Sequence, residues 1–165
     1  QQKIQDLADL DICWHFIGAI QSNKTKVIAE NFDWVHCVDR LKIAKRLSEQ
    51  RPDSLPPLNI CIQVNVDLED TKGGIALEQL PALSQQISQL PNIRLRGLMT
   101  IPAPSDSVES QRKPFAKLRE AFEEMQKNAI ECDTLSMGMS EDYEAAILEG
   151  STMIRIGTNI FGARN

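Results

Sequence analysis

Four residues near the C-terminus have the types and the spacing of an anion-binding site: Ser140, Arg155, Gly157 and Thr158. Ser140 follows one apolar run and Gly157 follows the next, so both lie where two successive parallel strands would end and where such folds bind phosphate. Arg155 interrupts the second run, and an unpaired guanidinium is costly to bury. The pattern predicts a phosphate-bearing ligand with a second group facing Arg155. It leaves open that Arg155 instead pairs with a neighbouring carboxylate.

The segment between the two runs predicts a short amphipathic helix. Ser140 opens it, and two acidic residues occupy its first turn, as is typical of helix starts. Its inward face is expected to carry Tyr143, Ala146 and Ile147, and Gly150 ends it. The helix would therefore connect the two phosphate-binding strand ends.

Strand-like and helix-like segments alternate along the whole chain. The predicted strands cover residues 14–18, 34–38, 58–66, 93–101, 134–137 and 153–157. Helices are predicted over 23–31, after a capping Asp39, over 77–90 and over 111–127. Mostly apolar strands that alternate with helices indicate a parallel sheet covered by helices.

The choice between an open doubly wound sheet and a (β/α)₈ barrel favours the barrel. No strand is followed by a GxGxxG turn. Gln63 and Asn65 lie on one face of their strand, opposite apolar neighbours, and His15 breaks an apolar run in the same way. A closed barrel has an interior that such polar side chains can line near the strand ends.

The composition excludes several classes of protein. The 165 residues suit one domain over 1–165 with a real core. A net charge of −5 argues against a nucleic-acid surface. No apolar run reaches the roughly 18–20 residues of a membrane span. The four cysteines lack metal-ligand spacing, so we predict no metal site and a cytoplasmic, reducing location.

Several separated segments resemble one known family. They are WHFIGAIQSNKTKVI at 14–28, residues 58–66, RGLMTIPAP at 96–104, residues 135–146 and IRIGTNIFGAR at 154–164. These segments are similar to those of the pyridoxal phosphate homeostasis family, which resembles the N-terminal barrel of alanine racemases. The resemblance implies a (β/α)₈ barrel of the alanine racemase N-terminal type that holds pyridoxal 5′-phosphate (PLP) at the C-terminal strand ends.

The resemblance also implies roles for the residues singled out above. Ser140, Gly157 and Thr158 match the positions that hold the phosphate, and Arg155 matches the residue that faces the pyridine nitrogen. An arginine cannot accept a proton from the ring, so it should weaken the cofactor as an electron sink. We further expect Asn65 on the hydroxyl side of the cofactor.

Three other side chains have types that could contact the cofactor. Met99 lies at a strand end and is expected near the cofactor ring, although methionine at such a place is commonly core filler. His15 and His36 are expected to be satisfied core residues rather than acid–base groups. No residue is predicted to be catalytic.

In this family a lysine on the first barrel strand forms a Schiff base with PLP. The match begins only after the second strand, so we expect this lysine upstream of Gln1 and strands three to eight in this chain. The piece should then be less stable than the full-length protein. Lys72, in the loop after residues 58–66, could form a transient imine with PLP. The alternative is that Lys72, like Lys24 and Lys26, is an ordinary solvated lysine.

Two function classes follow from the resemblance. The first is a non-catalytic PLP carrier that works in vitamin B6 homeostasis and delivers the cofactor to PLP-dependent apo-enzymes. The second is a PLP-dependent amino-acid racemase, which needs a tyrosine from a separate β-domain. We expect no such domain after Asn165, and Tyr143 is placed on a helix, so the carrier is favoured. We expect a monomer at full length. A phosphate-ester enzyme rests on fold analogy alone.

Overall fold

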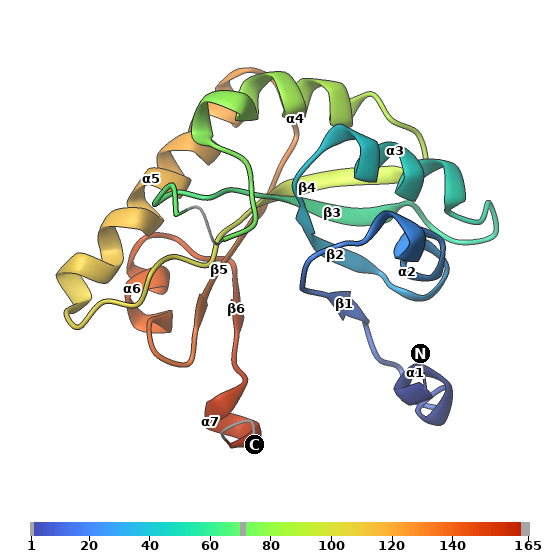
Figure 1. Ribbon diagram of the computed structural model, residues 1–165, viewed down its shortest axis with the longest axis horizontal. Helices are drawn as coiled ribbons and strands as arrows, with labels where there is room; N and C mark the ends of the chain where they lie inside the picture. The colour runs from blue at the N-terminus through green and yellow to red at the C-terminus, as the bar shows by residue number, and fades with distance from the viewer. Residues whose placement is uncertain (1, 70–71, 163–165) are drawn as a thin grey trace.

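A computed structural model describes residues 2–69 and 72–162 (Figure 1). Six strands form one parallel sheet whose spatial order follows the sequence, β1-β2-β3-β4-β5-β6. The strands are β1 (His15–Phe16), β2 (Trp34–Val38), β3 (Leu58–Gln63), β4 (Ile93–Met99), β5 (Thr134–Met139) and β6 (Met153–Arg155). A doubly wound sheet reverses its strand order at a switch point, whereas this order is that of a barrel wall.

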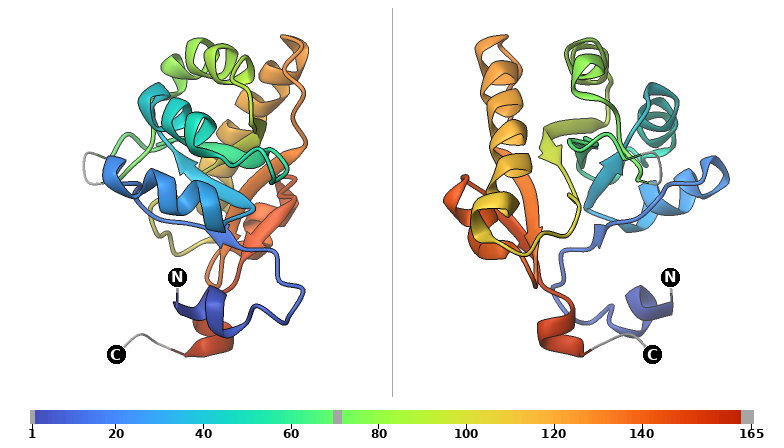
Figure 2. Two further views of the ribbon diagram at one scale, coloured as in Figure 1. Left: turned by 90° about the vertical axis from the view of Figure 1, so that its right-hand side faces the viewer. Right: turned by 60° about the vertical axis from the view of Figure 1, so that its left-hand side comes forward.

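The helices that connect successive strands lie on the outer, convex side of the sheet, as Figures 1 and 2 show. These connecting helices are α2 (Thr25–Asn31), α3 (Leu41–Gln50), α4 (Leu80–Ser88), α5 (Val108–Lys127) and α6 (Tyr143–Leu148). The short elements are α1 (Gln2–Asp6), α7 (Thr158–Phe161), η1 (Ser22–Lys24) and η2 (Leu77–Gln79). Within the described residues, no helix is both long and apolar enough to cross a membrane.

The hydrophobic core fills the layer between the sheet and the helices. Ile60 and Ile62 of β3 are fully buried there, as are Leu47 of α3 and Phe115 and Leu118 of α5. Each full burial of such a side chain contributes roughly 1.5–3 kcal/mol. The amphipathic stripes that predicted the helices are therefore the stripes that hold them on the sheet.

The sheet curls strongly, and one hydrogen bond demonstrates it. His36 of β2 and Ser136 of β5 are 2.8 Å apart between Nδ1 and Oγ, although β3 and β4 lie between their strands. In a flat sheet those strands would be ~14 Å apart. The six strands are thus an arc of a barrel, which confirms the predicted fold class.

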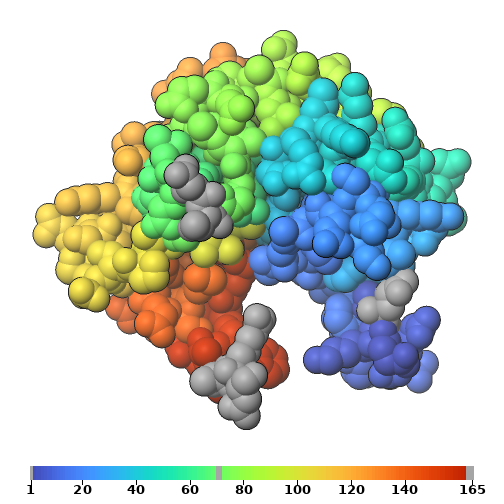
Figure 3. Space-filling model, viewed as in Figure 1, coloured from blue at the N-terminus to red at the C-terminus, as the bar shows by residue number. Residues whose placement is uncertain are grey.

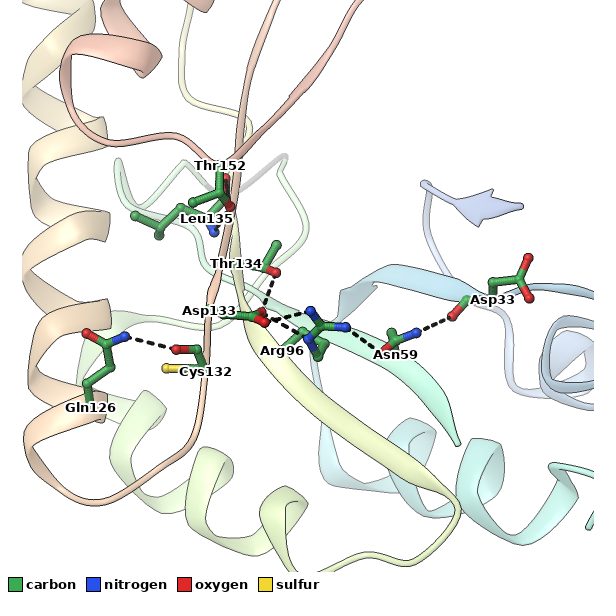
Figure 4. A network of polar contacts seen from close by, with 9 residues as sticks. All are labelled: Asp33, Asn59, Arg96, Gln126, Cys132, Asp133, Thr134, Leu135 and Thr152. Atoms are coloured by element: carbon green, nitrogen blue, oxygen red, sulfur yellow. Dashed lines mark hydrogen bonds and ion pairs between the residues drawn. The ribbon is translucent and has the colours of Figure 1, made fainter. Parts of the chain in front are cut away.

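The inner face of the arc is polar at its N-terminal end (Figure 4). Arg96 of β4 forms a bidentate ion pair with Asp133, at 2.9 and 2.6 Å, and donates to Asn59 of β3. The Arg96 guanidinium also lies 4.7 Å from the ring centre of Trp34 on β2. These contacts join β2, β3 and β4 to the residue that precedes β5, and they support the scaffold rather than the site, since they lie opposite the C-terminal strand ends.

The predicted strands agree with the observed ones in place and differ at their ends. β1 and β6 are shorter than expected, because the chain leaves the sheet after Phe16 and Arg155. β5 extends two residues further than predicted, to Met139. Helix α5 begins at Val108, where Ser107 accepts a capping hydrogen bond from the Ser110 backbone N–H.

Candidate functional site

A hollow opens at the C-terminal ends of β1, β2, β5 and β6, and we refer to it as the inner hollow. It measures about 580 Å³ and is lined by His15, Ile17, His36, Ile101, Met139, Met153, Ile154, Arg155, Ile156 and Gly157. Figure 3 shows the molecule indented between the segment of β6 and α7 and the segment of β1. The volume lies in the range of small-molecule sites. A second hollow, between α4 and α5, lies on the outer side, and none of the predicted site residues lines it.

Arg155 provides the positive charge of the inner hollow. Its Nη1 donates to Ser136 Oγ at 2.7 Å and its Nη2 donates to the Thr100 carbonyl oxygen at 2.9 Å. Burial lowers the pKa of the guanidinium, and the charge of Asp142 opposes that shift. None of the ion pairs among the described residues includes Arg155. Its partners are a hydroxyl and a carbonyl, not the carboxylate that the sequence left open.

The predicted anion-binding residues converge at the rim of the inner hollow. Ser140 follows β5 and Gly157 follows β6, as expected from the two apolar runs. Ser140 Oγ accepts from the backbone N–H groups of Gly157 and Asn159, both at 3.4 Å. Thr158 begins α7 beside them and is exposed. The sequence prediction missed Asn159, although it directly follows the Gly-Thr turn that carried the prediction.

Ser140 does not open a helix, and the predicted inward face of that helix is partly wrong. Helix α6 begins at Tyr143, and the preceding Asp142 turns its carboxylate back to accept from the Met139 N–H at 2.6 Å. Ala145 and Ala146 are buried, whereas Ile147 is 53% exposed. The Asp142 bond shortens the helix and leaves the Ser140 hydroxyl free to face the turn after β6.

Gly157 is a glycine that packing does not explain. Its φ of −117° lies outside the left-handed region, and a Cβ built on it would meet no atom within 4 Å. Gly97 is the opposite case, because a Cβ there would lie 1.8 Å from the Thr134 carbonyl oxygen. Open space above Gly157 at the edge of the inner hollow suits the close approach of a ligand.

Two further predicted site residues lie elsewhere. Asn65 holds its own loop, with Nδ2 donating to the Glu69 carbonyl oxygen at 2.8 Å and Oδ1 accepting from the Glu69 N–H at 3.2 Å. Met99 is 1% exposed within β4. Lys72 Nζ lies 3.1 Å from Glu69 Oε2. None of these residues is among those lining the inner hollow in the described part of the chain.

Two histidines line the inner hollow, and they are linked to Arg155. His15 Nδ1 and His36 Nε2 are 2.9 Å apart, and His36 Nδ1 contacts Ser136 Oγ, which also accepts from Arg155. Burial lowers the pKa of His36 to about 3, and the neighbouring His15 and Arg155 add to the shift. The sequence alone predicts structural roles for both histidines. Residues 2–69 and 72–162 contain no cluster of three or more metal-ligating side chains.

Comparison with known proteins shows the family to which the chain belongs. Residues 7–165 match the family described as "Alanine racemase, N-terminal domain". The chain is 61% identical over 163 residues to the pyridoxal phosphate homeostasis protein of Pseudomonas aeruginosa and 51% identical over 164 residues to that of Escherichia coli K12. In both cases the match spans 99% of this chain and 70% of the relative.

A solved structure shows the same fold at a sequence identity that supports kinship. PipY of Synechococcus elongatus PCC7942, solved with PLP bound, superposes with a TM-score of 0.89 at 37% identity. The superposition covers 98% of this chain and 76% of PipY. The chain therefore belongs to the family of pyridoxal phosphate homeostasis proteins, which is built on the alanine racemase N-terminal domain.

Proposed function

We propose that this protein binds PLP in the inner hollow and carries or buffers the cofactor in PLP homeostasis. One observation carries the proposal: a half-buried arginine with neutral partners lines the inner hollow, and the Ser140 hydroxyl contacts the backbone N–H of Gly157 at the edge of the same hollow. PLP has the matching ends, a phosphate and a ring nitrogen. The names of the relatives and the PLP bound to PipY support the assignment.

The donor set fits the cofactor at both ends. Ser140, Thr158 and the N–H groups of Gly157 and Asn159 would hold the phosphate, since hydroxyl and backbone N–H donors suit an anion. Of the five N–H groups of Arg155, two are bonded to Ser136 and Thr100, which leaves donors for the pyridine nitrogen. When bound, PLP supplies an aldehyde and an electron-withdrawing ring.

The position of Tyr143, the single tyrosine of the sequence, favours a carrier over a racemase, and Arg155 sets the electronic character of the cofactor. Because a guanidinium donates and does not accept, Arg155 would leave the ring nitrogen unprotonated and the ring a weak electron sink. A two-base racemase also needs a tyrosine beside the ring. Tyr143 lies on α6, with its hydroxyl 3.5 Å from Glu144 Oε1, and is not a lining residue of the inner hollow. We therefore propose that the protein has no catalysis of its own.

We also propose that two further βα units complete the barrel and carry the lysine that anchors PLP. β1 and β6 are the two edge strands of the described sheet, and the free edge of each can pair with a further strand. The relatives are longer than this chain, which spans 70% of their length.

Four free cysteines, two of them buried, support a reducing cytoplasm, where PLP-dependent apo-enzymes would receive the cofactor.

A binding titration tests the function. PLP should bind, and pyridoxal, which lacks the phosphate, should bind more weakly. The double variant Ser140→Ala/Thr158→Ala should lose affinity for PLP but little for pyridoxal, because the two hydroxyls address the phosphate. Arg155→Ala should weaken PLP modestly and change its spectrum. Ser88→Ala, an exposed hydroxyl of α4, is the control. Equal affinity in all these proteins would remove the proposed site.

A further inference from the structure

A continuous chain of hydrogen bonds runs along the wall of the inner hollow, from Arg155 of β6 to Cys13, just before β1. Arg155 Nη1 is 2.7 Å from Ser136 Oγ, and Ser136 Oγ is 2.8 Å from His36 Nδ1. His36 Nε2 is 2.9 Å from His15 Nδ1, and His15 Nε2 is 3.4 Å from Cys13 Sγ. The chain crosses from β6 through β5 and β2 to β1, so it exists only because the sheet curls.

The chemistry of its first member gives this chain one direction. Arg155 only donates, so Ser136 Oγ accepts from it. Within the described residues, the only acceptor near the Ser136 hydroxyl hydrogen is His36 Nδ1. A neutral His36 then carries its hydrogen on Nε2 and donates to His15 Nδ1. His15 in turn carries its hydrogen on Nε2 and donates to the Cys13 sulfur.

Burial enforces that direction. Ser136 is fully buried and His36 is 1% exposed, so neither has water to satisfy a donor or an acceptor that its neighbour leaves unmet. Burial and the charge of Arg155 both hold the pKa of His36 far below its usual value, which keeps the ring neutral. Stacked rings further restrain the group: His15 lies on Trp34, with 5.5 Å between ring centres and an interplanar angle of 8°.

We propose that Ser136, His36 and His15 are positioning residues that hold the Arg155 guanidinium toward the pyridine nitrogen of the bound cofactor. The proposal rests on the proposed function and deepens it, by naming what orients the arginine. Ser136 occupies one N–H of Arg155 and the Thr100 carbonyl occupies another, so the guanidinium plane is set from two sides. An arginine set in this way does not turn toward the phosphate end.

The chain also makes the arrangement sensitive to acid at one place. If His15 were protonated on Nδ1, two N–H donors would meet between His15 Nδ1 and His36 Nε2. His36 would then have to carry its hydrogen on Nδ1, so that Nε2 could accept from His15. Ser136 would then meet two donors, from His36 and Arg155, and its own hydrogen would lose its acceptor. The charged and titratable groups that face the two histidines are Asp33, Cys13 and Arg155.

The first test needs no cofactor. Long-range ¹H–¹⁵N correlation spectra of the ¹⁵N-histidine-labelled protein at neutral pH report which ring nitrogen carries the hydrogen. We expect neutral rings with the hydrogen on Nε2 in both His15 and His36. A hydrogen on Nδ1 of His36, or a charged His36, would overturn the proposed direction, and with it the positioning role.

The second test uses the bound cofactor. Ser136→Ala should shift the visible absorption band of bound PLP, weaken PLP roughly fivefold through one lost hydrogen bond and allow both His36 tautomers. Ser84→Ala removes a hydroxyl that is equally buried but bonds within α4, and should leave the band unchanged. Ser136→Thr, which keeps the hydroxyl, should restore the band.

The outcomes separate the two proposals. If the wild-type protein binds no PLP, the proposed function fails. If Ser136→Ala binds PLP with the wild-type absorption band, only the positioning role fails. If Ser136→Ala does not fold, the remaining two measurements decide: a hydrogen on Nδ1 of His36 in the wild-type protein, or a shifted PLP band in Ser136→Thr, overturns the positioning role, whereas a hydrogen on Nε2 together with the wild-type band in Ser136→Thr supports it.

Discussion

Glu149 and Arg112 form an ion pair that holds the segment before β6 against the longest helix. Both Nε and Nη2 of Arg112 lie 2.7 Å from Glu149 Oε1, while Arg119 reaches Oε2 at 3.3 Å. The Glu149 side chain is 7% exposed, at the C-terminal end of α6. Since α6 connects Ser140 to β6, this pair helps to place the two halves of the anion rim.

Glu149→Ala should therefore destabilise the protein by ~1–3 kcal/mol, because it leaves two arginines without their buried partner. This loss of stability is at the low end of the values for buried ion pairs, because both arginines are partly exposed. Urea unfolding measures the change. Glu123→Ala removes the exposed partner of the same Arg119 and should cost less than ~0.5 kcal/mol. Equal losses in the two variants would show that burial of Glu149 contributes nothing.

Gly97→Ala should unfold the scaffold by separating β4 from β5. The residue has a φ of +155°, and its Cβ would lie 1.8 Å from the Thr134 carbonyl oxygen and 2.8 Å from its carbon. Neither backbone atom can move without breaking the strand pair, so we expect a loss on the order of 3 kcal/mol or more. Thermal unfolding measures it.

Gly157→Ala is the matched control for that experiment. A Cβ at Gly157 meets no atom within 4 Å, so the melting temperature should change little. The added methyl group occupies the space where a phosphate would approach, so affinity for PLP should fall instead. A stable Gly97→Ala protein, or a Gly157→Ala protein with full affinity for PLP, would contradict these two assignments.

The sequence predicted the scaffold and the rim because both depend on local patterns. The apolar runs place Ser140 and Gly157 at adjacent strand ends, and Arg155 stands out as a charge within such a run. The chain of hydrogen bonds from Arg155 to Cys13 could not be predicted in this way. His36 and Ser136 are 100 residues apart, and only the curvature of the sheet brings them together.

Where the structure places predicted residues differently from the expectation, the causes are equally specific. Asn65 is polar at a strand end, as a cofactor contact should be, but its amide is taken up by the turn that Glu69 belongs to. Ser140 has the sequence context of a helix cap, but Asp142 accepts a hydrogen bond from the Met139 N–H, and the helix begins only at Tyr143. Competition between neighbouring side chains for the same backbone groups decides such cases, and composition and spacing do not reveal its outcome.

The cysteines should react with a thiol reagent in the order of their exposure. Cys13 is exposed, whereas Cys37 and Cys61 are buried, and burial raises the pKa of these two thiols to about 11 and about 12. Because the thiolate is the reactive form, we expect Cys13 to be modified first at pH 8. Cys37 and Cys61 should react only after unfolding. Mass mapping of modified peptides checks the order, and early labelling of Cys61 would contradict its burial in β3.

Acid should destabilise the protein through His36. The pKa of His36 is lowered to about 3 in the folded state from a usual value of 6.5, so the unfolded state binds an extra proton between those limits. The contribution of neutral His36 to the unfolding free energy is therefore fully present above pH 6.5. It is lost as the pH drops toward 3, by up to ~1.4 kcal/mol per pH unit. Urea unfolding between pH 7 and pH 4.5 measures this slope.

His36→Gln removes this titration and separates it from that of the carboxylates. The variant should be less stable than wild type at pH 7, where it lacks the bonds to His15 and Ser136. Its stability should fall less steeply with acid, so the two curves approach each other as the pH decreases. Parallel curves would mean that the fold does not hold His36 neutral. The chain of hydrogen bonds to Arg155 would then have no fixed direction, because that direction requires a neutral His36.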